Sequence, residues 1–449
     1  MRIHFIAIGG SAMHNLAIAL SKKGFQVSGS DDQIFEPSSS RLQKYGLLPA
    51  EMGWDVSRIT ADLDAVILGM HARKDNPELL KAQELGLKIY SYPEYIYEQS
   101  KDKLRVVIGG SHGKTTITSM ILHVLKHQNK AFDYLVGAQL EGFETMVKLT
   151  DAPIIVIEGD EYLASPIDMR PKFHLYKANL AVISGIAWDH INVFKTYDDY
   201  KLQFDKFIDS IEPNGSLIYC SLDEDLNELV KNNQKEVNKI PYGLPENKVV
   251  DGVTYLEPEH IGLKVFGNHN LLNLNAAKLI CKELGIDEIA FNESISSFSG
   301  AAKRLELLFN GKTTNVYKDF AHSPSKLKAT IEAVKSQFPD RKLVACIELH
   351  TFSSLNLEFL KTYANTMDLA DEAIVFIDND TFLHKKLEPF NQNDVRTNFK
   401  NLNLLFFDDI SKLKVHLKSI NFANSNLLLM SSGNFSGLDL NKLARELTV

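Results

Sequence analysis

The chain has 449 residues, of which 44% are hydrophobic and 24% are charged, and both fractions are ordinary for globular proteins. At roughly 150 residues per domain, this length predicts about three domains rather than one large core. The 49 Lys and Arg residues against 57 Asp and Glu residues give a formal charge of -8, without a polybasic tract. The composition therefore argues against intrinsic disorder and fibrous architectures, and it disfavours nucleic acid as a partner.

The three cysteines, Cys220, Cys281 and Cys346, are widely separated and have no metal-ligand spacing. They fit a reducing compartment, where they would fill core space. No apolar run approaches the length of a membrane-spanning helix, and the N-terminal segment lacks the pattern of a signal peptide. We therefore expect a cytoplasmic protein without a membrane partner, which acts as a monomer or a weak homo-oligomer.

Short apolar runs alternate with amphipathic stretches along the chain. This pattern predicts an α/β fold, in which strands of mostly parallel sheets are followed by crossover helices. A first block, residues 1–100, has predicted strands at 3–8, 26–30 and 65–69, a helix at 13–22, and a polar stretch at 98–103 that is typical of a linker.

Two further blocks follow with the same alternation. In residues 101–300 we expect strands at 104–108, 153–157 and 180–184, and a helix at 270–284. In residues 301–449 we expect strands at 314–317, 343–347, 373–377, 404–407 and 427–430.

The strongest local signal is a glycine-rich loop between a predicted strand and a predicted helix, Gly110-Ser111-His112-Gly113-Lys114-Thr115-Thr116. Glycines allow backbone N–H groups to face phosphate oxygens, and the helix N-terminus adds positive potential. Lys114 would neutralise the β and γ oxygens, and Thr115 would offer its hydroxyl to magnesium. The full Walker spacing requires glycine at Ile108, so the motif is a shortened loop that predicts nucleotide binding.

The N-terminal glycines carry a weaker signal. A dinucleotide fingerprint requires glycine at three positions that read Ile8, Gly10 and Met13, so hydride transfer is disfavoured. A diphosphate could still meet the helix N-terminus at Gly9, Gly10 and Ser11, and a ribose could meet the second strand end at Ser30 and Asp31. Tight packing of strand against helix is the alternative explanation.

Acidic residues follow the predicted strand at 153–157, in the order Glu158-Gly159-Asp160-Glu161. Open α/β sheets bind ligands at the carboxyl ends of their strands, and magnesium prefers oxygen ligands. Glu158 is therefore a candidate ligand beside Thr115. Asp189-His190 occupies the same position after the next strand, although a lone histidine can equally be structural.

Other candidates lie further along the chain. Asn268, Asn270 and Asn273 place several amides on one turn, which suits an adenine edge, although capping of the helix explains Asn268 as well. Arg304 could act as a fixed cation on the γ-phosphate or could be a solvated surface group. Asp319 and His322 follow the strand at 314–317 and form a second strand-end cluster.

These motifs, taken in order, resemble those of the ATP-dependent Mur ligases over nearly the whole chain. The similarity rests on the loop of Lys114, on the acidic run of Glu158, and on four further motifs: Asp189-His190, His269-Asn270-Leu271-Leu272-Asn273, Lys303-Arg304 and Asp319-Phe320-Ala321-His322. The resemblance implies a Rossmann-like UDP-sugar domain at 1–100, a central ATPase domain at 101–300 and a Rossmann-like amino-substrate domain at 301–449.

The resemblance also implies roles for single residues. Lys114, Glu158, His190 and Arg304 would be catalytic, and magnesium would be held by Thr115, Glu158 and His190. ATP would also be contacted by Gly110, Ser111, His112, Gly113, Thr116, Asn270, Asn273 and Asp319. The UDP sugar would be contacted by Gly9, Gly10, Ser11, Ser30, Asp31 and Asn76, and the amino substrate by His322 and His350.

Two branches of the family fit, and both join an amine to UDP-N-acetylmuramate through an acyl phosphate. One branch adds L-alanine, and the other adds the peptide L-Ala-γ-D-Glu-meso-diaminopimelate during peptidoglycan recycling. The peptide branch is more similar at Met1-Arg2-Ile3-His4, at Asp168-Met169-Arg170-Pro171-Lys172-Phe173 and at Arg304-Leu305-Glu306-Leu307. A nucleotide-binding regulatory protein without ligase activity is the alternative from another class.

Some residues depart from the family pattern. Ala7 and Ala12 occupy positions where the UDP loop usually has glycine. The family usually places arginine near His350, to hold a substrate carboxylate, and this chain has none there. The residues aligned with a carbamylated lysine are Gln203 and Phe204, so we predict no carbamate.

Overall fold

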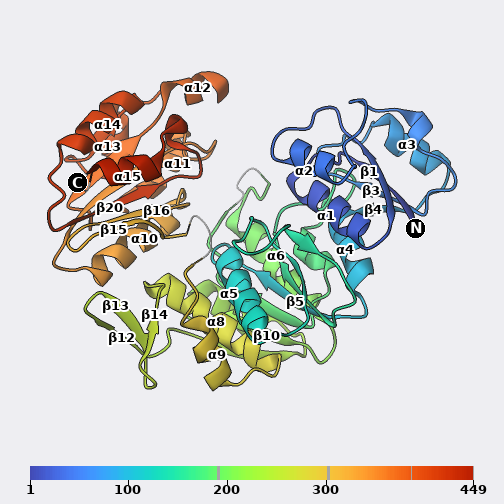
Figure 1. Cartoon of the computed structure of the whole chain (residues 1–449), viewed down its shortest axis with the longest axis horizontal. Helices are drawn as coiled ribbons and strands as arrows, with labels where there is room; N and C mark the ends of the chain where they lie inside the picture. Colours follow the sequence, from blue (N-terminus) through green and yellow to red (C-terminus); the bar gives the residue numbers. More distant parts are fainter. Residues whose placement is uncertain (190–192, 301–303, 386, 448–449) are drawn as a thin grey trace. The chain divides into compact units, whose positions relative to one another are not determined.

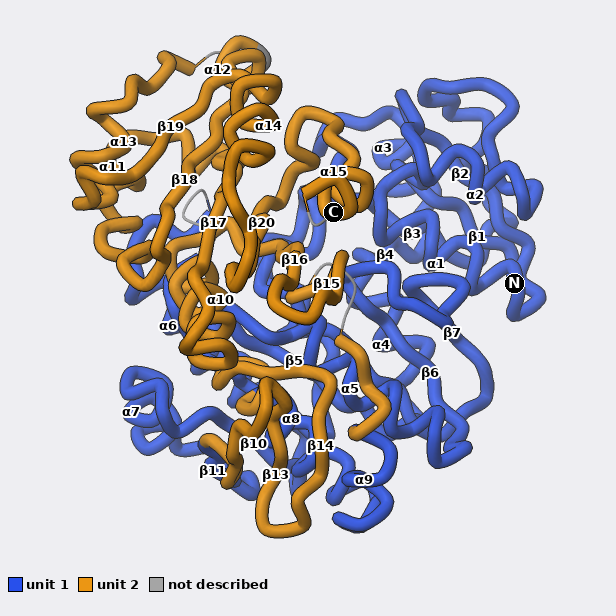
Figure 2. The backbone as a smooth tube through the Cα atoms, turned by 60° about the vertical axis from the view of Figure 1, so that its left-hand side comes forward, with its two compact units in different colours: residues 1–243, 273–295 blue, residues 244–272, 296–449 orange. Residues whose placement is uncertain are grey.

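The computed structural model describes residues 1–189, 193–300, 304–385 and 387–447 (Figure 1). The chain forms two compact units, residues 1–243 with 273–295 and residues 244–272 with 296–449 (Figure 2). The α/β class and the mostly parallel sheets predicted from the sequence are confirmed. None of the described helices is both long enough and apolar enough to cross a membrane.

The first sheet of unit 1 is parallel, with four strands among the described residues in the order β2-β1-β3-β4. The apolar runs of β1 and β3 are buried on both faces, as expected for a parallel sheet between helices. The elements are β1 (Arg2–Ile6), α1 (Ser11–Lys22), β2 (Gln26–Ser30), α2 (Ser38–Lys44), a 3-10 turn (Val56–Arg58), β3 (Ala65–Leu68), α3 (Pro77–Glu84), β4 (Ile89–Ser91) and α4 (Tyr92–Ser100).

The second sheet of unit 1 has seven strands within the described ranges, in the order β11-β10-β9-β5-β8-β6-β7. Its strands are parallel except for the short β7 at the edge. They are β5 (Leu104–Gly109), β6 (Asp133–Leu135), β7 (Val147–Lys148), β8 (Ile154–Glu158), β9 (Leu180–Ile183), β10 (Ser216–Cys220) and β11 (Asn238–Tyr242). Since β5 lies between β8 and β9, the carboxyl ends of these three strands meet at one edge.

The helices associated with the second sheet are α5 (Lys114–His127), α6 (Tyr197–Asp209), α7 (Glu224–Asn232), α8 (Asn268–Glu283) and α9 (Glu288–Ile295), with a 3-10 turn at Lys172–Leu175. The division between the two units runs through α8, which begins in unit 2 and continues in unit 1.

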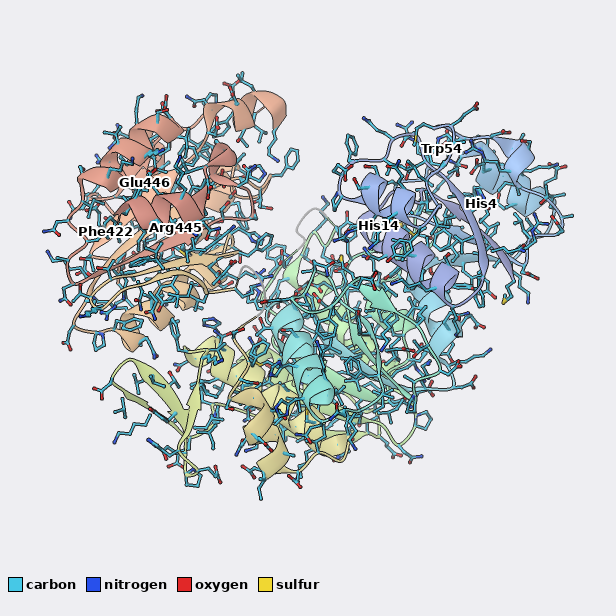
Figure 3. The ribbon with its side chains drawn as sticks, viewed as in Figure 1. His4, His14, Trp54, Phe422, Arg445 and Glu446 are labelled. Atoms are coloured by element: carbon cyan, nitrogen blue, oxygen red, sulfur yellow. The ribbon has the colours of Figure 1, made fainter. Side chains whose placement is uncertain are left out.

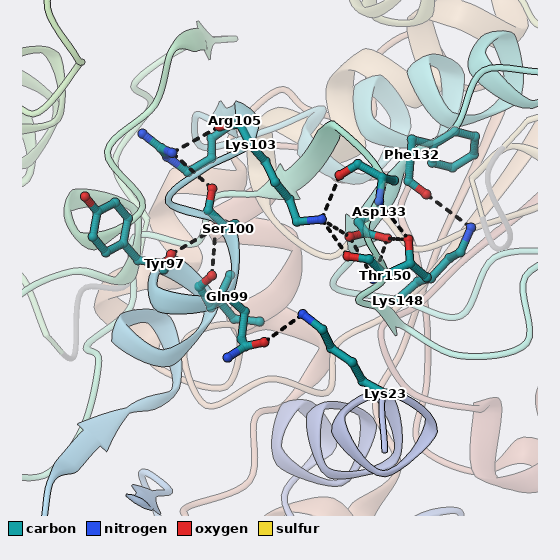
Figure 4. Close-up of polar contacts among 12 residues, drawn as sticks. Lys23, Tyr97, Gln99, Ser100, Lys103, Arg105, Phe132, Asp133, Lys148 and Thr150 are labelled. Atoms are coloured by element: carbon teal, nitrogen blue, oxygen red, sulfur yellow. Dashed lines mark hydrogen bonds and ion pairs between the residues drawn. The ribbon is translucent and has the colours of Figure 1, made fainter. Parts of the chain in front are cut away.

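The polar stretch at 98–103 is not a free linker. Its first three residues form the last turn of α4. This helix begins after Ser91, which forms a capping box with Glu94. The buried Arg105 then donates to the carbonyl groups of Ser100, Lys101 and Lys103 at 2.7–3.1 Å (Figure 4). The connection between the first two sheets is therefore held by hydrogen bonds.

Unit 2 contains a small antiparallel sheet of β12 (Asn247–Val250), β13 (Val253–Leu256) and β14 (Ile261–Leu263), which the sequence patterns did not predict. Its larger sheet has the order β15-β16-β20-β17-β18-β19 in the part of the chain that the structure describes. The strands are β15 (Glu306–Asn310), β16 (Asn315–Asp319), β17 (Lys342–Glu348), β18 (Glu372–Phe376), β19 (Leu405–Phe407) and β20 (Ser425–Met430), and only β15 is antiparallel to its neighbour.

Both faces of this larger sheet are buried. Alternate residues of β17, Val344 and Cys346, pack into one core cluster, and Ala345 and Ile347 pack into another. The helices of this part are α10 (Pro324–Gln337), α11 (Leu357–Leu360), α12 (Asn379–Lys385), α13 (Gln392–Phe399), α14 (Ile410–Ser419) and α15 (Leu440–Leu447), with 3-10 turns at Lys361–Tyr363 and Phe435–Gly437.

Candidate active site

The glycine-rich loop connects β5 to α5, as the sequence predicts. Gly110 and Gly113 have φ values of +125° and +80°, which residues with a Cβ rarely adopt. A Cβ on Gly110 would lie 2.8 Å from the backbone nitrogen of Ser184. The Ser111 amide and hydroxyl both donate to the Gly185 carbonyl, and the Ser184 hydroxyl donates to the His112 carbonyl. The loop is thus fixed against the end of β9.

Lys114, the first residue of α5, is held by two acceptors. Its Nζ lies 2.7 Å from the buried carboxylate of Glu161 and donates to the Gly110 carbonyl at 2.6 Å. Burial alone would lower the pKa of Lys114, but the carboxylates of Glu161 and Asp160 reverse this effect and raise it. Lys114 therefore stays charged, as neutralisation of phosphate oxygens requires.

Thr115 and Glu158 meet at the same edge. The Thr115 hydroxyl donates to Glu158 Oε1 at 2.8 Å, and the Gly137 amide donates to Oε2 at 2.8 Å. Burial raises the pKa of Glu158, and these two hydrogen bonds partly oppose the shift. A hydroxyl and a carboxylate oxygen beside a nucleotide loop suit Mg²⁺, which usually takes one or two carboxylates with phosphate and water as its other ligands. The donor set therefore fits magnesium.

His190, the other expected magnesium ligand, lies outside the described residues, and so does Lys303 of the Lys303-Arg304 motif. The role expected for His190 stays a prediction. Within the described ranges, no group of three or more His, Cys, Asp or Glu side chains is arranged to hold a metal.

The two asparagines expected at the adenine lie on the same helix, α8. A Cβ on Gly113 would overlap the side-chain amide of Asn273, so this amide packs directly on the nucleotide loop. Asn270 instead donates from Nδ2 to the Phe266 carbonyl at 2.9 Å, one turn earlier. The structure thus brings Asn273 to the loop, whereas the Asn270 amide donates to a carbonyl group just before the start of α8.

Three other candidates gather in unit 2, around Phe320. The Arg304 guanidinium lies 4.8 Å from the centre of the Phe320 ring, and the His322 ring packs edge-on at 5.3 Å. Asp319 is buried and accepts from the amides of Leu305 and Ala321, each at 2.7 Å. Burial raises the pKa of Asp319, and these amides together with Arg304 limit the rise.

His350 follows β17 and packs against a turn after β20. A Cβ on Gly433 would lie 3.1 Å from His350 Cγ and 2.8 Å from Glu348 Oε2. The buried Glu348 carboxylate also accepts from the Ser431 hydroxyl and from the Phe435 amide, the latter at 2.9 Å. His350 therefore lies at the carboxyl edge of the sheet, where the amino substrate was expected.

The N-terminal loop is organised by Asp31. Its Oδ2 accepts from the Gly9 amide at 2.7 Å, and a Cβ on Gly9 would clash with Asp31 and Ile34 at 2.8–2.9 Å. Burial raises the pKa of Asp31 to about 6, although the Gly9 hydrogen bond opposes this. Ala7 adopts φ +68° without being glycine. The loop ends at α1, where Gly10 is the N-cap and Ser11 is the first helical residue.

Two other residues expected at the UDP sugar have structural partners. The Ser30 hydroxyl donates to Glu78, which is fully buried. The side-chain oxygen of Asn76 caps α3 by accepting from the amides of Glu78 and Leu79 at 2.9 and 3.1 Å. These contacts explain both residue types without a ligand.

Sequence reasoning assigned no role to Glu161 or to Gly137. Glu161 lies within the acidic run after β8, and its position three residues after Glu158 is the sequence feature that could have identified it as a site residue. Its Oε1 also accepts from the buried Tyr200 hydroxyl at 3.2 Å. Gly137 follows β6 without a distinctive motif, so only the fold reveals its hydrogen bond to Glu158.

Two family models match this chain: the catalytic domain of the Mur ligase family over residues 2–103 and the Mur ligase middle domain over residues 108–281. A UDP-N-acetylmuramate–L-alanine ligase from Caldicellulosiruptor bescii is 33% identical over 388 residues, which cover 83% of this chain and 82% of the relative.

Solved structures agree on the fold. The UDP-N-acetylmuramate-alanine ligase of Thermotoga maritima has a TM-score of 0.67 at 22% identity and covers 100% of this chain and 98% of its own. The UDP-N-acetylmuramate:L-alanyl-gamma-D-glutamyl-meso-diaminopimelate ligase of Neisseria meningitides has a TM-score of 0.58 at 26% identity and covers 66% of this chain and 98% of its own. The chain belongs to the Mur ligase family of ATP-dependent ligases, which form C–N bonds.

Proposed function

We propose that this protein uses ATP to join a short peptide, L-Ala-γ-D-Glu-meso-diaminopimelate, to the carboxylate of UDP-N-acetylmuramate. The ligase chemistry rests on one observation above all, the contact of Thr115 with Glu158 beside the charged Lys114. The peptide as amino substrate is supported by the motifs around Asp168 and Arg304 and by the 26% identity to the Neisseria peptide ligase.

The proposed reaction has two steps. A muramoyl carboxylate oxygen attacks the γ-phosphorus of ATP, the bond from this phosphorus to the β–γ bridging oxygen breaks, and ADP leaves. The peptide α-amine then attacks the acyl carbon, so that the C–N bond forms, the bond to phosphate breaks and the amine loses a proton. An α-amine has a pKa of about 7.7–8.0, so a neutral fraction is present near pH 8.

In this proposal the residues of the nucleotide loop act mainly by positioning and charge. Lys114 neutralises the β and γ oxygens after exchanging its contact with Glu161 for phosphate. Thr115 and Glu158, together with His190, would hold magnesium, which supplies further positive charge when bound. Arg304 and Asp319 would contact ATP from residues 301–449, and His322 and His350 would face the amine.

In this proposal, different ranges of the chain bind the different substrates. Residues 1–100 would hold the UDP sugar at Gly9, Gly10, Ser11 and Asp31, and residues 101–300 would hold ATP. The partner molecules are thus UDP-N-acetylmuramate, ATP and the peptide.

A second candidate keeps the chemistry and changes the amine to L-alanine. The observation in its favour is the 33% identity to the C. bescii ligase, whose name states that activity.

The test measures ADP release with ATP, magnesium and UDP-N-acetylmuramate, with either the tripeptide or L-alanine, and product mass. We expect turnover with the tripeptide alone. Turnover with L-alanine alone would move the protein to the second candidate. No ADP release with either amine, from a folded protein, would contradict the proposed ligation.

A further inference from the structure

Two buried polar residues lie in the second turn of α1, directly after the N-terminal glycine loop. His14 and Asn15 expose 1% and 0% of their surfaces, and Figure 3 shows His14 on this helix. Polar side chains buried this deeply require hydrogen-bonding partners. Their partners lie on both sides of the junction between the first and second sheets of unit 1.

The partners of His14 define its protonation. Its Nδ1 lies 3.0 Å from the Gly10 carbonyl oxygen, which can only accept, so Nδ1 carries the hydrogen. Its Nε2 lies 3.0 Å from Asn15 Nδ2, which can only donate, so Nε2 accepts. The ring is therefore neutral, and the Ser38 hydroxyl lies 3.0 Å from the same Nδ1. Burial lowers the pKa of His14, which agrees with a neutral ring.

Asn15 carries the connection to the second sheet. Its Nδ2 donates to the Ser11 carbonyl at 2.8 Å as well as to His14, and its Oδ1 accepts from the Met146 amide at 3.0 Å. Met146 immediately precedes β7 and is itself buried. One side-chain amide thus joins the helix start at Ser11 to the edge of the ATP-binding sheet.

The segment 137–146, between β6 and β7, connects this contact to the candidate magnesium ligand. At its start, the Gly137 amide holds Glu158 Oε2 at 2.8 Å, and at its end Met146 is held by Asn15. Two further contacts reach the segment at its surface: Arg41 donates to Gln139 at 3.0 Å in a partly buried hydrogen bond, and the exposed Glu144 pairs with Lys22 at 2.8 Å. The segment is therefore attached at one end to Glu158 and at the other to α1.

We propose that His14 and Asn15 are positioning residues that keep the segment 137–146, and through it Glu158, in register with the UDP-sugar loop at 9–11. This inference rests on the proposed function. The first step requires a carboxylate bound by one sheet to reach a γ-phosphate bound by another. A misplacement of about 1 Å between reacting groups can lower the rate by about 100-fold.

Three variants test whether His14 and Asn15 position the segment 137–146. Asn15→Leu has a similar size and removes every polar contact of the amide. His14→Asn keeps a donor near the position of Nδ1 and removes the acceptor for Asn15, whereas His14→Gln keeps an acceptor near Nε2 and removes the donor to Gly10. The matched control is Glu144→Gln, which weakens an exposed contact of the same segment, and exposed ion pairs contribute little.

The measurements are kcat for ADP release, KM for ATP, the Kd for UDP-N-acetylmuramate by calorimetry, and thermal unfolding. We expect kcat to fall about 100-fold in Asn15→Leu and about 10-fold in each His14 variant, with KM for ATP changed less than threefold. The Glu144→Gln control should stay within twofold of the wild type. A merely structural role would lower the unfolding temperature without this separation of kcat from KM.

A readout independent of ligation is hydrogen exchange of residues 138–146 with and without UDP-N-acetylmuramate, in the absence of ATP and amine. We expect the nucleotide sugar to protect this segment in the wild type and to protect it less in the His14 variants. Each of these variants keeps a polar group at one of the two ring-nitrogen positions, so the test stays valid if Asn15→Leu does not fold.

The outcomes separate the two proposals. Normal kcat and unchanged protection in folded His14 variants would overturn the positioning role while leaving the ligase assignment intact. Absence of UDP-N-acetylmuramate binding to the wild-type protein would overturn both. Loss of ligation with any amine, while the nucleotide sugar still binds and protects 138–146, would overturn the proposed function alone.

Discussion

The ammonium of Lys114 lies 2.7 Å from the carboxylate of Glu161, whose side chain is completely buried. Tyr200 donates to the other oxygen of the same carboxylate at 3.2 Å. The cation required for phosphate binding is thus already paired within the protein. ATP binding has to replace this carboxylate with phosphate oxygens, and the pair should therefore influence both stability and nucleotide affinity.

Glu161→Gln should destabilise the protein more without ATP than with it. The amide is nearly isosteric, but it leaves the ammonium of Lys114 without its charged partner, at a cost of roughly 1–3 kcal/mol. Bound phosphate would supply the missing charge. Urea unfolding with and without ATP and magnesium measures the difference.

The matched control for this variant is Glu84→Gln, which weakens the exposed pair with Lys81. It should change the free energy of unfolding by less than about 1 kcal/mol in either condition. Equal destabilisation of Glu161→Gln with and without ATP would show that phosphate does not take over the contact.

Lys114→Ala should abolish ADP release while the fold is retained. Loss of one charged group aimed at the reacting phosphate typically lowers kcat by about 10²–10³ or more. ADP release by a coupled assay measures the activity, and circular dichroism during thermal unfolding measures the fold. Normal ADP release by a cooperatively unfolding variant would contradict the role proposed for Lys114.

Gly113→Ala should cost more stability than Gly285→Ala, although the two glycines have similar φ values of +80° and +75°. Each substitution forces alanine into the left-handed region, at about 1 kcal/mol. Only the Cβ at position 113 meets another group, the amide of Asn273, whereas nothing lies within 4 Å at position 285.

The difference between these two glycine variants in urea unfolding isolates the clash with Asn273. We also expect KM for ATP to rise in Gly113→Ala and to stay unchanged in Gly285→Ala. Equal free energies of unfolding for the two variants would mean that the Asn273 amide moves away freely. Its packing on the loop would then contribute nothing to stability.

Stability should fall as the pH is lowered from about 6.5 to about 4, partly because of His174. Burial lowers the pKa of His174 from 6.5 to about 4, although its hydrogen bond to the Gln203 carbonyl opposes the shift. Well above pH 6.5 the ring is neutral in both states. As the pH falls through 6.5 toward 4, the unfolded chain takes up the proton first, so the folded state loses up to roughly 3 kcal/mol.

His174→Gln keeps a hydrogen-bond donor and removes this titration. Urea unfolding between pH 7.5 and 5 should therefore show a shallower pH dependence than in the wild type. His269, whose pKa burial also lowers to about 4, adds its own share to both curves. An unchanged slope in His174→Gln would rule out the contribution of His174.

Local patterns in the sequence were sufficient for the α/β class and for the loop of Lys114. Apolar runs such as that of β9, which is buried along its whole length, are typical of parallel sheets covered on both faces, and the positive φ values at positions 110 and 113 favour glycine. Both features depend on residues that are neighbours in the chain, which is why periodicity and spacing could identify them.

Contacts between distant segments were decided only by the tertiary structure. Nothing near Lys114 in the sequence indicates that Glu161 is its partner, and Gly137 belongs to no motif, yet the order of β5, β8 and β6 in the sheet brings both to the site. The same holds for Asn15, whose amide looks like an ordinary helix residue until Met146, 131 positions away, is placed against it. A sequence determines such pairs through the whole fold, because burial forces each polar group to find a partner wherever the packing puts one.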